Sequence, residues 1–225
     1  MIVTIDGPAG SGKSTVARLL ADQLKIRYLD TGAMYRAIAL AVVQSEFDEN
    51  DVDTVTGVAR SAKIEFRGKD IYLNDINVTE EIRSANVTAV ASVVAANPGV
   101  RTRLVELQEK IGEAADLVTE GRDQGTVVFP NADHKFFVTA SLSTRAERRH
   151  REMLAIGSSL TLHTVRAQLR QRDERDENRV YAPMKPAADA SVIDTSDMTI
   201  GDVVQELAGR VRRLRAESGE QRAES

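Results

Sequence analysis

The chain has 225 residues, 42% of them hydrophobic, and a formal net charge of −4 at neutral pH, which excludes a chain-wide electrostatic attraction to nucleic acid or acidic lipid. The absence of cysteine excludes disulfides and thiolate metal sites and suits a reducing cytoplasm. No apolar run approaches membrane-spanning length, and Met1 leads directly into a predicted strand without a basic segment. We therefore expect a globular protein with no signal peptide.

The first fourteen residues carry the strongest motif. Residues 2–5 (IVTI) predict a strand buried on both faces, and GPAGSGKS at 7–14 matches the phosphate loop G-x-x-x-x-G-K-[ST]. Its glycines allow successive N–H groups to point into one concavity, and the helix predicted next adds the positive end of its dipole. Lys13 can then reach β/γ-phosphate oxygens, and the Ser14 hydroxyl can bind Mg²⁺. The alternative is a glycine-rich turn before an ordinary helix.

The next elements predict an inserted small sheet. We expect a short strand at 27–30 and helices at 34–43 and 52–59. Residues 62–67 and 71–74 then alternate apolar and polar side chains, as half-exposed antiparallel strands do. Residues 75–78 add a possible third strand, so an antiparallel insertion is expected at about 60–80.

The second half of the chain predicts an α/β fold. Thr79 is expected to cap a helical region through 96, and Pro98 to begin a helix to about 115. Extended segments are expected at 116–120, 126–129, 134–138 and 190–193, and helices at 141–153, 160–175 and 199–215. Because strands alternate with helices, we predict a parallel core sheet covered on both sides, with ligands beyond the carboxyl ends of its strands.

Two further stretches follow predicted strands, LDTGAMYR at 29–36 and TEGRDQGT at 119–126. Gly32 is expected to free the backbone at a strand end, and Arg36 to project from the next helix. Gly121 and Gly125 would allow the backbone to approach a ligand closely. The alternatives are a capped helix with a surface arginine and an ordinary charged loop.

Arginines cluster between residues 145 and 179, and two interpretations are open. Several of them could converge on phosphates, because guanidinium groups bind phosphate bidentately. They could instead form solvated faces with internal salt bridges, since acids are interleaved among the later ones. Those acids and the scarcity of aromatic residues argue against nucleic-acid binding. The arginines are Arg145, Arg148, Arg149, Arg170, Arg172, Arg175 and Arg179.

In these motifs and their order the chain resembles the bacterial cytidylate kinases, a family of nucleoside monophosphate kinases. The resemblance covers Ile2 to about Leu214 and rests on residues 5–15, 29–36, 78–83 (VTEEIR), 120–123 (EGRD), 125–130 (GTVVFP), 172–176 (RDERD) and 182–183 (AP). It implies a P-loop kinase fold in one domain, 1–216. Residues 217–225 have no apolar face, and we expect them to form a disordered tail. Within that domain it implies a core at 1–44, 98–143 and 180–216, a monophosphate-binding subdomain at about 45–97, and a short helical lid at about 144–179.

The resemblance also implies a reaction, the transfer of the γ-phosphoryl group of ATP to CMP or dCMP with Mg²⁺ as cofactor. The implied partners are these nucleotides, with no nucleic acid and no membrane, and a cytoplasmic monomer is expected. The alternatives are a P-loop kinase for another small acceptor and a low-turnover P-loop regulator. A second anion site formed by Arg36, Arg122 and Arg179 argues against the regulator.

The residues that the resemblance implies fall into three groups. The ATP phosphates would be held by Gly7, Pro8, Ala9, Gly10, Ser11, Gly12, Lys13, Ser14 and Thr15, with Ser14 also on the metal. The CMP site would comprise Thr31, Arg36, Ser92, Arg101, Arg122, Asp123, Arg172, Asp176 and Arg179. The catalytic residues would be Lys13, Arg122, Arg179 and, closing from the lid, Arg145 and Arg148.

Asp123 is expected to read cytosine together with Ser92 and Arg101. Its alternative role is to hold Arg122 through a salt bridge. Gln124 stands where the family usually has an apolar residue, and this departure beside Asp123 leaves the base selectivity open.

Overall fold

The computed structural model describes residues 1–155 and 157–223, with the side chains of 214–223 left out, and it divides into two compact units. Unit 1 comprises Met1–Leu29 and Ala115–Ser225, and unit 2 is the continuous stretch Asp30–Ala114. Neither boundary coincides with the expected subdomain at 45–97, because the helices that flank that stretch cluster with the inserted sheet. The expected lid at 144–179 belongs to unit 1.

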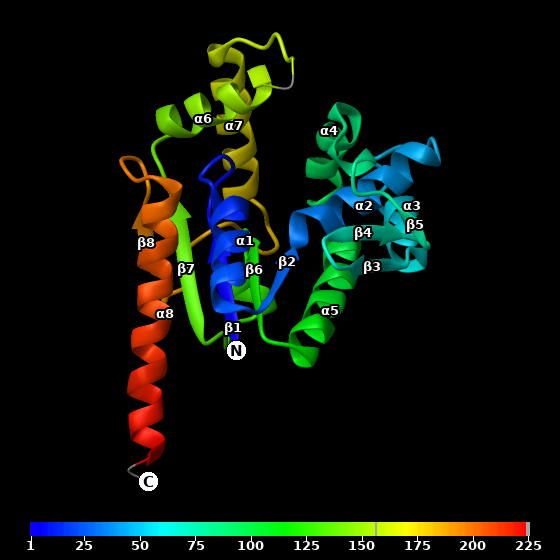
Figure 1. Cartoon of the computed structure of the whole chain (residues 1–225). Coiled ribbons are helices and arrows are strands. Elements are labelled where there is room, and N and C mark those ends of the chain that lie inside the picture. Colours follow the sequence, from blue (N-terminus) through cyan, green and yellow to red (C-terminus); the bar gives the residue numbers. More distant parts are fainter. Residues whose placement is uncertain (156, 224–225) are drawn as a thin grey trace. The chain divides into compact units, whose positions relative to one another are not determined.

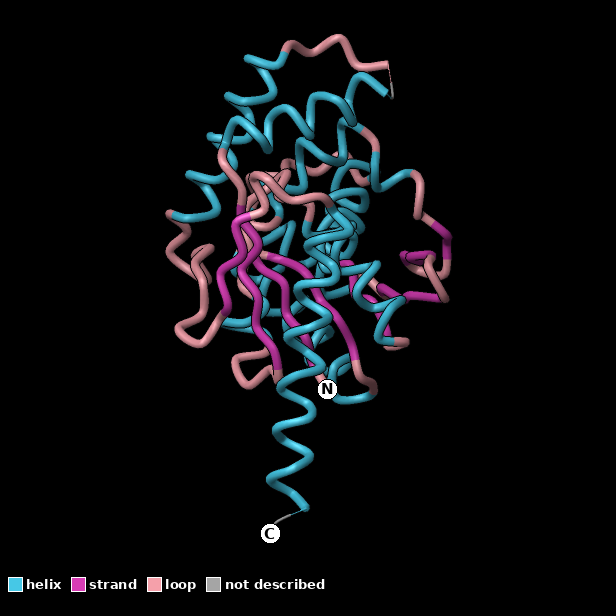
Figure 2. The backbone as a smooth tube through the Cα atoms, turned by 60° about the vertical axis from the view of Figure 1, so that its left-hand side comes forward, coloured by secondary structure: helices cyan, strands magenta, loops and turns pink. Residues whose placement is uncertain are grey.

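Unit 1 is built on a five-stranded sheet with the strand order β2-β6-β1-β7-β8 (Figures 1 and 2). The strands are β1 (Ile2–Asp6), β2 (Arg27–Asp30), β6 (Leu117–Gly121), β7 (His134–Thr139) and β8 (Ser191–Asp194). The central strand β1 runs parallel to β6 and β7, and β8 runs parallel to β7. Residues 3–6 of β1 are buried, as expected for an apolar strand covered on both faces. The predicted parallel core sheet is thus confirmed.

The α-helices in the described part of unit 1 are α1 (Lys13–Leu24), α6 (Leu142–Ala155), α7 (Leu162–Glu177) and α8 (Ile200–Ala223). Helices α1 and α8 pack together on the sheet, with Leu20 and Leu207 among the fully buried side chains of the shared core (Figure 1). Helix α6 packs against α7. This arrangement leaves the loop after β1 next to the α6–α7 pair, because Ala9 of that loop shares a small apolar cluster with Val165 and Leu169.

Unit 2 combines helices with a small sheet. Its elements are α2 (Thr31–Gln44), α3 (Val52–Ser61), β3 (Ile64–Arg67), β4 (Asp70–Leu73), β5 (Ile76–Asn77), a 3₁₀ turn (Glu81–Arg83), α4 (Ala85–Val94) and α5 (Pro98–Ala114). Strands β3, β4 and β5 pair antiparallel, which confirms the predicted insertion. Helix α2 packs on α4, and α3 packs on α5.

Three element predictions were wrong or incomplete. Thr79 does not cap a helix, since its hydroxyl accepts from Ile71 N at 3.0 Å, and Ser84 caps α4 instead. The expected extended segment at 126–129 lies largely within a π-helical turn (Gln124–Val128). The last helix does not end at 215 but continues to Ala223, which suits its helix-favouring alanine, glutamate and arginine residues. Residues 224 and 225 of the expected tail lie outside the described residues.

The part of the chain that the structure describes contains no helix with the length and apolar character needed to cross a membrane.

Candidate phosphate-binding site

The phosphate loop (residues 7–14) begins where β1 ends, and glycine geometry shapes it. Gly7 has a φ of 140°, and a Cβ placed on it would lie 2.1 Å from the carbonyl oxygen of Val138 in β7. The loop therefore leaves the sheet in close contact with the neighbouring strand. Gly12, at a φ of 88°, is the N-cap of α1, so the helix starts at Lys13 as the motif requires.

Lys13 is buried within this loop, with only 4% of its surface exposed. Its Nζ donates to the carbonyl oxygen of Pro8 at 2.7 Å. Burial, the largest cause, and the nearby guanidinium groups of Arg122 and Arg172 together lower the pKa of Lys13 to about 7, against the opposing effect of Glu120 and Asp6. A phosphate bound here would favour the charged ammonium, so the site is electrostatically suited to an anion.

Ser14 and Glu120 form the part of the site that could hold Mg²⁺. The Ser14 hydroxyl donates to Oε1 of Glu120 at 2.9 Å. A hydroxyl and a carboxylate are the hard oxygen donors that Mg²⁺ prefers, so these residues fit the metal. No group of three or more metal-ligating side chains occurs among the described residues, so phosphates and water would supply the other ligands. Glu120 is not among the metal residues predicted from the sequence, although its position near the end of a predicted strand is a signal for such a role.

Asp6 is a second residue that the sequence analysis missed. This last residue of β1 is buried, and its two carboxylate oxygens accept from Gln124 N at 2.9 Å and Gly125 N at 2.8 Å. Burial raises the pKa of Asp6 to about 7 in spite of these two hydrogen bonds. The bonds fix the π-helical turn that follows Arg122 and Asp123. An acidic residue at the end of an otherwise apolar strand was the available signal.

The glycines and the glutamine of this turn serve the protein's own packing. A Cβ on Gly121 would lie 2.8 Å from Cγ of Gln124, and one on Gly125 would lie 2.9 Å from Oγ1 of Thr4. These glycines therefore make room for the protein's own side chains, and the close approach of a ligand to their backbone stays a prediction. Gln124 is 2% exposed, and its Oε1 accepts from the Thr119 hydroxyl at 2.8 Å. Its departure from the family pattern is thus accommodated by a hydrogen bond inside the fold.

Three arginines gather around Asp176 on α7. Arg122 Nε donates to Oδ2 of Asp176 at 2.8 Å, and Arg179 Nε donates to its backbone oxygen at 3.2 Å. Burial alone would raise the pKa of Asp176, but the charges of Arg122, Arg172 and Arg179 outweigh it and hold that pKa below its usual value. These arginines thus gather at a carboxylate of the protein, and their convergence on phosphates stays a prediction.

The other arginines of this region bind protein atoms. Arg145 donates to the carbonyl oxygens of Ala9 and Ala140 and pairs with Asp173, while Arg148 donates to the hydroxyl and the carbonyl oxygen of Thr195. Arg149 pairs with Glu152 and Arg170 with Glu174 on exposed helix faces, as the solvated-face interpretation predicts.

Unit 2 carries the remaining substrate residues of the sequence analysis. Arg36 Nη2 lies 3.6 Å from Oδ2 of Asp30, whose other oxygen caps α2 by accepting from Ala33 N. Gly32 lies inside the first turn of α2, and a Cβ there would come within 3.2 Å of Nη1 of Arg36. It makes room for that guanidinium and does not free the backbone at a strand end, which corrects the expectation.

Two further substrate residues of unit 2 lie on other helices. Arg101 is buried on α5, 5.6 Å from the ring centroid of Tyr35, and donates to the carbonyl oxygen of Ala95. Ser92 is half-buried on α4, and its hydroxyl donates to the carbonyl oxygen of Ala89 at 3.3 Å. Thr31 is buried at the start of α2.

Comparison with known proteins decides the family. A family model described as Cytidylate kinase matches residues 3–213. The chain is 42% identical over 211 residues to the cytidylate kinase of Clostridioides difficile, covering 94% of this chain and 98% of that protein. The chain belongs to the cytidylate kinase family.

Other relatives place the family in a wider context. The chain is also 42% identical to a bifunctional pantoate ligase/cytidylate kinase of Synechococcus, spanning 97% of this chain but only 42% of that longer protein. Among solved structures, a shikimate kinase from Bacteroides thetaiotaomicron aligns with a TM-score of 0.52 at 12% identity, covering 94% of this chain and 98% of that one. This last likeness shows the P-loop kinase fold alone.

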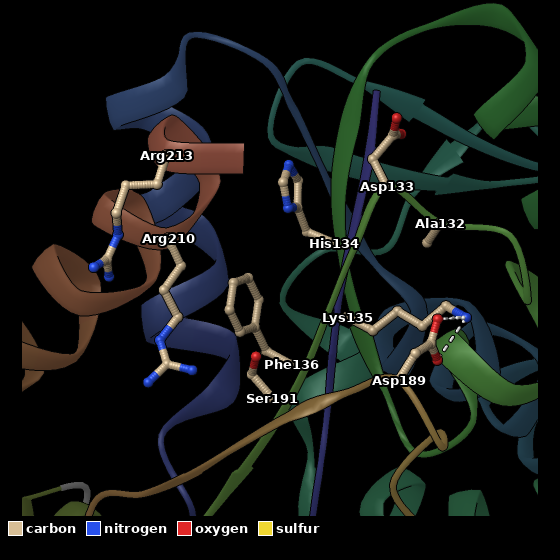
Figure 3. A pocket seen from close by; sticks show the side chains of 9 residues that line it. All are labelled: Ala132, Asp133, His134, Lys135, Phe136, Asp189, Ser191, Arg210 and Arg213. Atoms are coloured by element: carbon tan, nitrogen blue, oxygen red, sulfur yellow. Dashed lines mark hydrogen bonds and ion pairs between the residues drawn. The ribbon is translucent and has the colours of Figure 1, made fainter. Parts of the chain in front are cut away.

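A cavity of about 400 Å³, whose lining residues are drawn in Figure 3, lies at the amino end of β7, at the opposite end of the parallel strands from the phosphate loop of this cytidylate kinase family member. Its location follows from the strands, because it surrounds His134 at the start of β7 whereas the loop follows the end of the parallel β1. Several charged side chains that line the cavity pair with other groups of the protein. Lys135 pairs with Asp189, Arg210 pairs with Glu206, and Asp133 accepts from Ile2 N. We therefore place the candidate site at the phosphate loop and not in this cavity.

Proposed function

We propose that this chain transfers the γ-phosphoryl group of ATP to CMP or dCMP, giving ADP and CDP or dCDP. The observation that carries the proposal is the buried Lys13 of the phosphate loop, with Arg122 and Arg172 close enough to lower its pKa, in a member of the cytidylate kinase family. Cations gathered at a phosphate loop fit a reaction in which negative charge spreads over a transferring phosphoryl group.

The loop and Lys13 serve the donor in this proposal. Backbone N–H groups of residues 7 and 9–15 and the dipole of α1 hold the ATP phosphates, and Lys13 exchanges its contact with Pro8 for phosphate oxygens. Mg²⁺, bound through Ser14 with Glu120 beside it, would neutralise phosphate charge when present. Catalysis then consists of positioning and of charges arranged before the reaction begins.

The acceptor is held by the remaining residues. Arg36, Arg122 and Arg179 bind the phosphate of CMP, Arg172 and Asp176 approach its sugar, and Thr31 completes the CMP site. Ser92, Arg101 and Asp123 recognise the cytosine base. A carboxylate accepts from the N4 amino group of cytosine and repels the oxygen that uracil carries at the same position.

For Arg145 and Arg148 we propose positioning roles in place of direct catalysis. Both guanidinium groups bind carbonyl oxygens of the protein, so contact with ATP requires those hydrogen bonds to break first. We therefore give them positioning roles in the structure as it stands, and their direct contact with ATP stays a prediction.

The decisive experiment measures ADP release by a coupled assay against a panel of nucleoside monophosphates and small alcohols such as shikimate. We expect Mg²⁺-dependent turnover that is fastest with CMP and dCMP. Preference for another acceptor would replace the proposed substrate, and slow turnover with every acceptor would favour the nucleotide-binding regulator. A reaction without CMP measures ATP hydrolysis as the background.

We further propose that the chain works as a monomer in the cytoplasm. The absence of cysteine suits a reducing compartment. Light scattering of the purified chain tests the monomer, for which the expected mass is 24.6 kDa.

A further inference from the structure

Ala9, in the phosphate loop, is held by two side chains from different helices. Its N–H donates to Oδ1 of Asp173 on α7 at 3.3 Å, and its carbonyl oxygen accepts from Nη1 of Arg145 on α6 at 3.0 Å. The same Nη1 donates to Oδ2 of Asp173 at 2.5 Å. Both side chains are nearly buried, with 9% and 11% exposed. One buried ion pair therefore holds both backbone polar groups of a single loop residue.

Packing fixes the same part of the loop. The methyl group of Ala9 lies in a small apolar cluster with Ala146 of α6 and Val165 and Leu169 of α7. A Cβ on the next residue, Gly10, would come within 3.2 Å of the carbonyl oxygen of Arg145. Because protein interiors are close-packed, this part of the loop cannot shift without a response from α6 and α7.

Helix α7 makes a second ionic contact one turn after Asp173. Asp176 pairs with Arg122 at 2.8 Å, and residues three apart lie on one face of a helix. The same face of α7 thus contacts the donor-phosphate loop through Asp173 and an arginine of the proposed acceptor site through Asp176.

We propose that the Arg145–Asp173 pair is a positioning device that sets the Ala9 peptide groups in the phosphate loop and couples donor binding to acceptor binding through α7. Buried ion pairs add little net stability because the desolvation of two charges offsets their attraction, so a role in geometry accounts for this one better. Neither residue needs to touch ATP. The coupling rests on the proposed function, whereas the hold on the loop rests on the contacts alone.

The test is calorimetric binding of Mg²⁺ with a non-hydrolysable ATP analogue, with and without CMP. Asp173→Ala should weaken analogue binding about tenfold or more, the scale of loss when a bound group is misplaced. It should also abolish any change in that affinity caused by CMP. Glu174→Ala is the matched control, because the neighbouring Glu174 is exposed on the same helix and pairs only with Arg170 among the contacts described. It should retain both wild-type values.

A folded Asp173→Ala protein with wild-type analogue affinity would overturn the proposal. If that variant does not fold, Arg145→Met/Asp173→Leu exchanges the pair for apolar side chains, a change that often preserves a fold. Loss of analogue affinity at an unchanged melting temperature then supports positioning, and wild-type affinity overturns it. If CMP does not change the affinity of the wild-type protein for the analogue, the coupling is refuted. Because the analogue is never turned over, the comparison of analogue affinities between the wild type and the Asp173 variants stays valid whatever the enzyme phosphorylates. Failure to phosphorylate CMP would refute the proposed function.

Discussion

At the scale of single residues, Asp6 and Lys13 bracket the phosphate loop as two buried groups of opposite charge. Burial moves the pKa of each to about 7, upward for the carboxyl and downward for the ammonium. Asp6 has a structural use, since it holds the turn that carries Arg122 and Asp123. Lys13 has only a carbonyl oxygen as its hydrogen-bond acceptor among the contacts described, and this suits a residue whose main partner is a ligand.

We expect Lys13→Met to lower kcat by a factor of about 10² to 10³ or more, because a positioned charge that stabilises a transition state contributes about 3–4 kcal/mol. The coupled kinase assay measures the change. Lys110→Met, at an exposed position on α5, is the control and should retain wild-type turnover. A folded Lys13→Met enzyme with wild-type kcat would remove Lys13 from catalysis.

The lowered pKa of Lys13 also predicts how stability depends on pH. The charged ammonium lowers the stability of the folded state at and below about pH 7, and this penalty fades as pH rises from about 7 towards the ordinary lysine value. Lys13→Met removes the penalty. In the absence of nucleotide, the variant should therefore melt at a higher temperature than the wild type near pH 6, with the gap narrowing towards about pH 9. A gap that is constant across this range would contradict the lowered pKa.

Asp123→Ala separates the two roles considered for this carboxylate. If Asp123 reads the base, the variant should lose about 1–3 kcal/mol of preference for CMP over UMP, the usual scale for a misread base edge. If Asp123 only holds Arg122, kcat/KM should fall alike for both substrates. The ratio of the two kcat/KM values is the measurement, and an unchanged ratio would exclude base reading even in a badly impaired enzyme.

At the scale of elements, the phosphate loop could be predicted because its motif demands both a preceding strand and a following helix. The π-helical turn after Asp123 could not be predicted in this way. Its Thr126-Val127-Val128 run favours a strand by local propensity, and the deciding contacts are hydrogen bonds from the turn to Asp6, more than a hundred residues earlier. Thr79 failed as a cap for a similar reason, because its hydroxyl is used by Ile71 N of β4.

Gly7→Ala tests the contact between the loop and β7. Its Cβ would lie 2.1 Å from the carbonyl oxygen of Val138 in a backbone conformation that alanine rarely adopts. We expect a loss of about 2–4 kcal/mol in the free energy of unfolding, measured with denaturant. Gly57→Ala is the control, because a Cβ there meets nothing within 4 Å inside α3, and it should stabilise the protein by about 0.5–1 kcal/mol. Equal effects of the two substitutions would contradict the role given to Gly7.

At the scale of the whole molecule, the α/β alternation and the inserted sheet were predictable from the hydrophobic period of each segment. The limits of the two units were not predictable from the sequence, since they depend on which helices pack against the insertion. Arg36 and Arg101 come from one unit and Arg122 and Arg179 from the other. The sequence could nominate all four, but their hydrogen-bond partners became visible only in the folded chain.

Because the proposed substrate residues come from both units, we expect a bisubstrate mimic, with the donor and acceptor nucleotides joined, to slow hydrogen exchange in both. The affected amides should lie in β3–β5 and in α6, since a kinase must exclude water from the transferring group. Mass spectrometry of peptides from each segment, with ATP alone and CMP alone as comparisons, provides the measurement. Unchanged exchange in both segments would contradict a closing motion.

The insertion of unit 2 between the two parts of unit 1 affects how the chain emerges from the ribosome. Strand β1 has β6 and β7 as its neighbours, and Ile2 pairs in register with Leu117. The first strand therefore cannot pair until residues about 115 positions later (117 − 2) have been synthesised. At a synthesis rate of about 5–20 residues per second this interval lasts roughly 6–23 s. Unit 2 is continuous in sequence and emerges whole during that time. The apolar strand β1 must meanwhile be kept from misassociating, so the nascent chain is most vulnerable at the strand that later carries the phosphate loop.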